Sequence, residues 1–176
     1  MNRAALTAAT AITAALLAAC SSAPGTPKPV SSGQATATSS TTPATSESDA
    51  TSAFAVVSAT VPSAKIGTTV TAESDPNHLL GRPHQYTSKV TFTDGRIPAA
   101  DTDGKTPDDL ALGGSIESFS NAADAKARAD YIQAATSSLP MLTEYHYLHG
   151  TTLIRVTHLL TPTQAADYEK AAAKLP

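Results

Sequence analysis

Histidines are the residues of this sequence that most readily suggest metal chemistry. The chain has five of them: His78, His84, His146, His149 and His158. None lies in an HExxH or paired Cys/His signature, the spacings that gather zinc ligands. His146 and His149 are three residues apart, so they leave opposite faces of an extended strand. We therefore predict partly exposed histidines, no metal site and no cofactor, although His78, His84 and a third histidine could still meet in space.

Acidic residues suggest a second chemistry, calcium binding, in the segment 94–114. It carries five aspartates: Asp94, Asp101, Asp103, Asp108 and Asp109. Aligning Asp101 and Asp103 with the third and fifth positions of an EF-hand loop places Ala99 first and Leu110 twelfth, where oxygen ligands are required. The EF-hand interpretation fails, and weak calcium binding by these carboxylates stays open. A loop of this length is typical of a functional or contact segment.

Nucleophilic catalysis has no signature in the sequence. There is no GxSxG motif, most serines precede residue 64, and the single cysteine is Cys20. Glu117 and Glu144 could be paired as catalytic carboxylates, but Glu144 has a strand partner in Arg155. We predict no catalytic residues and do not favour an enzyme.

Cys20 lies at the end of an export signal. Arg3 is followed by sixteen uncharged residues rich in Ala and Leu, and the run ends Leu17-Ala18-Ala19-Cys20. This ending resembles the bacterial lipobox, which implies diacylglyceryl attachment to the cysteine sulfur and cleavage before it. The sequence predicts a signal peptide at 1–19 and lipidation of Cys20, the alternative being an ordinary secretory signal. Two acyl chains would anchor the protein durably in a lipid bilayer.

The segment 20–63 is predicted to be a disordered linker. From Ser21 to Ala50, 25 of 30 residues are Ser, Thr, Ala, Pro or Gly, a composition that buries too little apolar area to offset ordering entropy. Residues 50–63 differ, because they include Phe54 and several valines. This stretch fits either a first edge strand or further linker.

Charge and length limit the remaining function classes. Twelve Lys and Arg against 15 Asp and Glu give a net charge of −3, which excludes electrostatic binding of nucleic acid. Residues 64–176 are long enough for one small domain.

Hydrophobic alternation and helix caps divide this domain into strands and helices. The expected elements are a strand at 86–93, a weaker strand at 115–119, a helix from Asn121 to before Pro140, a hairpin at 143–158 and a helix from Thr161 to the C-terminus. We expect Asp124 to pair with Arg128, and Tyr131, Ile132 and Tyr168 to contribute to the core. The predicted fold is α+β, an antiparallel sheet in the order ββαββα with both helices on one face.

The hairpin divides into an apolar and a polar face. A turn at His149-Gly150 places Glu144 opposite Arg155 and gathers Tyr145 and Ile154 on the core side. The polar face is then expected to point outwards.

Several segments resemble a family of small actinobacterial lipoproteins. They include Asp75-Pro76-Asn77, Leu79-Leu80-Gly81-Arg82-Pro83, Tyr86-Thr87-Ser88-Lys89-Val90, Gly113-Gly114-Ser115, Ala125-Lys126-Ala127-Arg128-Ala129-Asp130-Tyr131-Ile132, Glu144-Tyr145, His149-Gly150 and Leu160-Thr161-Pro162. The resemblance covers about residues 75–175. It implies an exported, lipid-anchored protein of unassigned activity, and it carries no catalytic or ligand residues.

The sequence thus predicts an envelope lipoprotein on the extracytoplasmic face of a bacterial cell membrane, with a non-catalytic domain that binds an envelope protein or a cell-wall component. We call the segment 94–114 the acidic loop. The candidate contact surface combines the outward hairpin face and this loop: Glu144, His146, Leu148, Leu153, Arg155, Asp101, Asp103, Asp108 and Asp109. The alternative is a small-ligand or metal-binding lipoprotein that uses the histidines or the acidic loop.

Overall fold

The computed structural model describes residues 49–176. The predicted signal peptide, Cys20 and the linker up to residue 48 lie outside the described residues. The elements are α1 Ala50–Thr60, β1 Ala64–Thr69, β2 Ser88–Asp94, α2 Ala99–Thr102, η1 Leu110–Leu112, β3 Gly113–Ser118, α3 Ala122–Thr136, η2 Pro140–Leu142, β4 Glu144–His149, β5 Thr152–Thr157 and α4 Pro162–Ala172. Within this range, no helix has the length and apolar character needed to cross a membrane.

The strands form one antiparallel sheet in the spatial order β1-β2-β3-β5-β4. This confirms the predicted α+β class. Gly114 in β3 permits the close packing at the centre of the sheet, because a Cβ there would collide with the ring of Phe92 and the backbone oxygen of Arg155. The glycine pair that precedes the predicted second strand is therefore part of β3.

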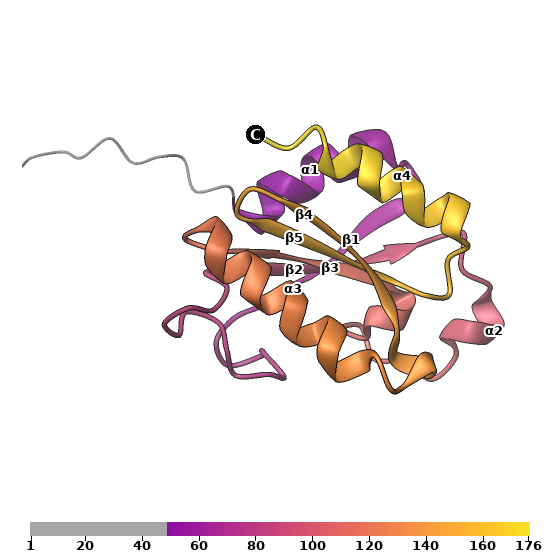
Figure 1. Cartoon of the computed structure of the whole chain (residues 1–176). Coiled ribbons are helices and arrows are strands. Elements are labelled where there is room, and N and C mark those ends of the chain that lie inside the picture. Colours follow the sequence, from indigo (N-terminus) through magenta and orange to yellow (C-terminus); the bar gives the residue numbers. More distant parts are fainter. Residues whose placement is uncertain (1–48) are drawn as a thin grey trace, which may run out of the picture. The chain divides into compact units, whose positions relative to one another are not determined.

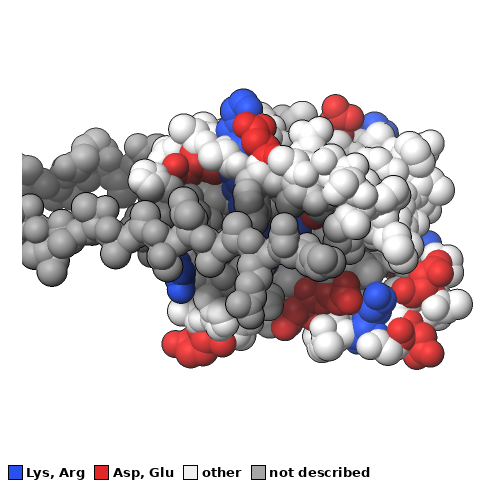
Figure 2. Space-filling view, turned by 60° about the horizontal axis from the view of Figure 1, so that its bottom comes forward, with Lys and Arg blue, Asp and Glu red and all other residues white. Residues whose placement is uncertain are grey.

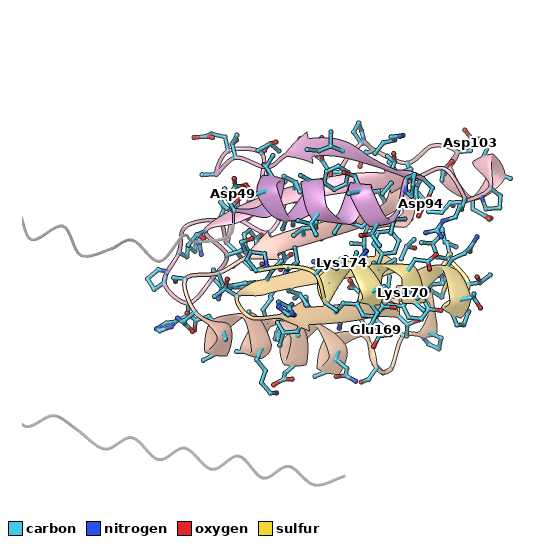
Figure 3. All side chains as sticks on the ribbon, turned by 90° about the horizontal axis from the view of Figure 1, so that it is seen from above. Asp49, Asp94, Asp103, Glu169, Lys170 and Lys174 are labelled. Atoms are coloured by element: carbon cyan, nitrogen blue, oxygen red, sulfur yellow. The ribbon has the colours of Figure 1, made fainter. Side chains whose placement is uncertain are left out.

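Helices cover both faces of the sheet. Figure 1 shows α1 and α4 on one side and α3 on the other, and Figure 3, seen from above, shows α1 and α4 side by side in front of the strands. The prediction of two helices on one face is thus wrong for α3 and α4. α4 instead shares its face of the sheet with α1, which the predicted order lacks.

The face under α1 and α4 is apolar. Phe92 stacks on Tyr168 with ring centroids 5.3 Å apart, and Phe54 of α1 lies 6.0 Å from Phe92. Ile116 and Ile154 in the middle of the sheet are fully buried beneath them. We call this side the apolar face.

Residues 50–60 form a helix and not a strand or linker. Asp49 caps it by accepting a hydrogen bond from the Thr51 backbone N–H at 2.7 Å. Ala53, Phe54 and Val57 are buried against the sheet, with a spacing that repeats every three to four residues. The helix belongs to the core of the folded region, which therefore begins before residue 64.

The predicted starts of α3 and α4 are confirmed. Asn121 accepts from the Asp124 backbone N–H at 2.9 Å at the start of α3. Thr161 and Gln164 form a reciprocal capping box at the start of α4. Both elements begin where the sequence indicates.

The hairpin forms with a register two residues away from the prediction. His149 pairs with Thr152, so the turn is Gly150-Thr151, and Gly150 adopts a φ of 53°. A shift of two keeps every side chain on its expected face, and Tyr145 and Ile154 still point to the apolar face.

Candidate functional site

A buried carboxylate surrounded by three cations lies between the sheet and α3. Glu117 of β3 has a fully buried side chain, and Arg128 of α3 donates to it at 3.0 Å. Arg155 of β5 donates to the same carboxylate at 2.9 Å, and the Nζ atom of Lys89 in β2 lies 3.6 Å away. We call this cluster, together with its partners Asp75 and Glu144, the buried ion network.

The antiparallel register brings these charges together. Lys89 lies directly opposite Glu117 between β2 and β3, and Leu153 lies opposite Glu117 between β3 and β5. Arg128 was expected to pair with Asp124 within the helix, but its side chain turns toward the sheet and reaches Glu117 instead. The α3 stripe is built from small residues such as Ala125 and Ala129, which leaves room for long charged side chains beneath the helix.

The turn between β1 and β2 closes one end of the network. Asp75 accepts from the backbone N–H groups of Leu79 and Leu80 at 2.7 and 3.0 Å and from the Tyr86 hydroxyl at 2.6 Å. The Tyr86 ring is contacted by Lys89, whose Nζ lies 5.1 Å from the ring centroid. Asp75 therefore holds the turn and positions an aromatic ring against the buried cations.

Glu144 and Arg155 form the other end of the buried ion network. Two guanidinium nitrogens of Arg155 each donate to Glu144 at 2.8 Å, so the pair is bidentate. The Nε2 atom of His146 lies 3.4 Å from a Glu144 oxygen. This confirms the predicted pairing of Glu144 with Arg155, although the observed strand register makes the contact diagonal.

The network keeps its carboxylates ionised. Burial by itself would raise the pKa of Glu117, but Arg155, Arg128 and Lys89 outweigh it and hold that pKa below its usual range. Burial likewise opposes ionisation of Glu144, yet His146 and Arg155 lower its pKa to about 2. Burial lowers the pKa of Lys89, and the nearby Glu117 partly offsets this. Near neutral pH the two glutamates are fixed charges and weak bases.

A cavity of about 720 Å³ opens above the buried ion network. Arg128, Glu144 and Arg155 line it from the network, while Asp101 and Asp109 line it from the acidic loop. We call it cavity 1. It therefore joins parts of the two regions that the sequence predicts as contact surfaces.

The rim of cavity 1 is apolar and exposed. Tyr131 of α3 is 66% exposed, and Met141 and Leu142 of η2 are 83% and 56% exposed. Leu139 lies next to them in the chain and is also exposed. Large exposed apolar side chains gathered at one cavity are typical of a binding site. The expectation that Tyr131 contributes to the core is wrong.

A second cavity of about 510 Å³ adjoins the first, because both are lined by Asn77, Arg128 and Tyr131. The lining of this second cavity also includes His84, whose Nδ1 lies 3.1 Å from an Asp124 oxygen. His84 has a φ of 62°, in the left-handed region that few residues other than glycine adopt. We call this cavity 2.

The predicted contact residues are only partly available for contact. Leu153 is fully buried, and the side chains of Glu144, His146 and Arg155 are 3%, 15% and 13% exposed. The prediction of an outward polar hairpin face is therefore wrong at these positions, because α3 covers it. Leu148 is exposed but does not line cavity 1.

Asp101, Asp103 and Asp108 are exposed, and Asp109 is partly buried. Asp109 accepts from the Ala111 backbone N–H at 2.9 Å and pairs with Lys105 at 3.6 Å. Asp103 and Asp108 do not line cavity 1. Among residues 49–176, no three His, Cys, Asp or Glu side chains are grouped to hold a metal ion.

Sequence reasoning missed Lys89, Arg128, Tyr131 and the turn residue Asn77 as site residues. Lys89 and Glu117 carried a usable signal, because opposite charges on neighbouring strands favour cross-strand pairing. The position of Arg128 was a second signal in the sequence, since it follows Ala125 by three residues and so lies near the helix face that packs on the sheet.

Comparisons with known proteins give no relative: no family model matches the chain, and no curated protein sequence or solved structure is detectably similar to it.

Proposed function

We propose that this protein is a membrane-anchored envelope lipoprotein whose folded region binds a partner or ligand through cavity 1 without catalysing a reaction. The observation that carries the proposal is the joining of the acidic loop and the charged hairpin side chains at one cavity with an exposed apolar rim. Its volume of about 720 Å³ lies in the range of ligand-binding pockets. The lipobox-like ending at Cys20 supports the anchor.

The state of the charged groups favours binding over catalysis. A general base works best when its pKa lies near the operating pH, whereas the pKa of Glu144 is about 2. The carboxylates of Glu117 and Glu144 are also occupied by arginines. Glu144, Arg128 and Arg155 form a charged floor of cavity 1, and the exposed rim above it supplies the contact surface.

Site-specific photo-cross-linking in intact cells tests the proposal. Met141, on the rim, is replaced by p-benzoylphenylalanine in the full chain, and Ile66, an exposed residue of β1 outside cavity 1, receives the same group as a matched control. We expect a reproducible cross-linked species from position 141 and none from position 66. Mass spectrometry then gives the chemical class of the captured molecule.

The anchor is tested in the same cells with Cys20→Ala. Removal of the thiol should release the chain from the membrane fraction and abolish the cross-link from position 141. A cross-link that is equally strong from position 66, or that no variant produces, would contradict binding at cavity 1. Membrane retention of Cys20→Ala would contradict the lipid anchor alone.

A further inference from the structure

The two cavities under and beside α3 form one extended groove. They share Asn77, Arg128 and Tyr131 in their linings, and their volumes are about 720 and 510 Å³. The exposed ring of Tyr131 lies where they meet. We call the combined feature the α3 groove. Such a shape accommodates a chain of several linked units better than a single compact molecule.

The charge balance of the α3 groove argues against an anionic occupant. Its lining carries four carboxylates and three cationic side chains: Asp101, Asp109, Asp124, Glu144, Lys105, Arg128 and Arg155. Both arginines already donate to buried glutamates. On the side of the molecule shown in Figure 2, basic and acidic side chains of the described residues are interspersed and form no continuous basic surface. A polyanion would find no attractive field here.

The polar groups of the groove suit hydroxyl groups. Asn77 and Gln85 have side-chain amides, which offer both donors and acceptors, Asp124 offers acceptors and Arg128 offers donors. A sugar hydroxyl is both a donor and an acceptor, so it can use each of these side chains. Gln85 is partly buried and contributes its side chain to the lining of cavity 2.

Tyr131 adds the apolar component of such a site. Tyr131 is 66% exposed and belongs to the lining of both cavities. One face of a hexose ring is composed of C–H groups, and an exposed aromatic ring provides a flat apolar surface for it. Apolar Leu79 and Ala127 lie in the lining of cavity 2 as well. The groove thus combines an aromatic platform with polar side chains on either side.

An extended peptide fits this groove less well. Peptides that bind to sheets add a strand to an exposed edge and use backbone hydrogen bonds. The α3 groove is lined by side chains from α3, from the turn at residues 77–85 and from the acidic loop, and it lies over a sheet face. Its donors and acceptors are therefore side-chain groups.

We propose that the α3 groove binds a neutral glycan, with Tyr131 stacking on one sugar ring and Asn77, Gln85, Asp124 and Arg128 contacting hydroxyl groups. The inference rests on the proposed function, since it names the class of ligand that the binding module takes. In this proposal Arg128 keeps its hydrogen bond to Glu117 when the glycan is bound, and its remaining guanidinium N–H groups donate to the sugar hydroxyl groups.

Saturation-transfer NMR with the full chain tests this. The probes are three tetrasaccharides: chitotetraose, cellotetraose and maltotetraose. We expect at least one to show saturable transfer centred on ring C–H protons. Tyr131→Ala should weaken binding by about two- to tenfold, the effect of removing one aromatic contact, while Tyr131→Phe keeps the ring and retains binding. Ile66→Ala, an exposed apolar control outside the groove, should bind like the wild type.

Two results would overturn the glycan assignment. One is the absence of saturable transfer for all three sugars, and the other is equal binding by wild type and Tyr131→Ala. A protein or peptide captured from position 141 in the cross-linking experiment, with no sugar binding, would leave the proposed function standing and reject the glycan. Failure of both experiments would reject both proposals.

Discussion

The two faces of the sheet are buried by different means. On the apolar face, two helices cover aromatic and aliphatic side chains, and Phe92 lies between Phe54 and Tyr168. On the α3 face, one helix with small side chains covers the buried ion network around Glu117. The apolar face is closed by close packing, whereas the cavities lie on the α3 face. The difference separates a face that is stabilised by apolar packing from a face that carries buried charge and the candidate site.

Removal of the central aromatic ring should have the largest effect on stability. Phe92 is 1% exposed and contacts rings from both α1 and α4, so Phe92→Ala should cost about 3–5 kcal/mol of unfolding free energy. Urea unfolding followed by circular dichroism measures the loss. Ile66→Ala, which truncates an exposed residue, is the control and should change stability little. A loss below about 1 kcal/mol in Phe92→Ala would show that the apolar face does not dominate stability.

Neutralisation of Glu117 should also lower the stability strongly, for an electrostatic reason. Glu117→Gln keeps the shape of the side chain but leaves Lys89, Arg128 and Arg155 without their shared counter-charge. We expect a loss of at least about 3 kcal/mol, because breaking a buried ion pair leaves uncompensated charge. The matched control is Glu169→Gln on the exposed side of α4. Equal stability of the two variants would show that the network is solvated and not buried.

Acid should remove the stabilisation that ionised Glu144 contributes to the α3 face. The pKa of Glu144 is lowered to about 2 from its ordinary value, so the unfolded state binds more protons between about pH 4.5 and 2 and stability falls with pH across that range. Glu144→Gln should be less stable than the wild type by roughly 2–3 kcal/mol at pH 7. The difference should shrink as the pH falls toward 2, because the wild-type carboxylate then becomes neutral too.

Unfolding curves of both proteins at several pH values measure this convergence. Phe92→Ala serves as the comparison, because its deficit comes from lost packing on the apolar face and should change little with pH. A pH-independent gap between wild type and Glu144→Gln would contradict the role of ionised Glu144.

Local signals in the sequence were sufficient for most elements. The Asn121 cap, the Thr161 capping box and the alternation around Val90 and Phe92 each depend on neighbouring residues, and each predicted its element. The prediction for residues 50–60 was wrong because their valines suggested a strand. The helical spacing of Ala53, Phe54 and Val57 and the cap at Asp49 were the signals that favoured α1.

The candidate site was harder to predict, because it depends on which face α3 covers. Polar side chains such as Glu144 and Arg155 indicate a solvent-facing strand when each is considered alone. In the structure they are largely buried, since they pair with each other and Arg155 also pairs with Glu117 of β3. The acidic loop was identified correctly as a long segment, but its contribution to cavity 1 required the tertiary fold.

The smallest expected loss of stability comes from breaking an exposed ion pair on α3, the helix that also carries the buried Arg128. Arg128 of α3 faces inwards to Glu117, whereas Lys126 and Asp130 form an exposed pair at 2.6 Å on the outer surface. Asp130→Asn should cost only about 0.3–0.5 kcal/mol, because solvent screens the pair and holding both side chains costs entropy. Its deficit should decrease further in high salt, as measured by urea unfolding with and without added NaCl. A loss above 1 kcal/mol would mean that burial does not distinguish the ion pairs of α3, and the contrast between this helix's inner and outer charges would fail.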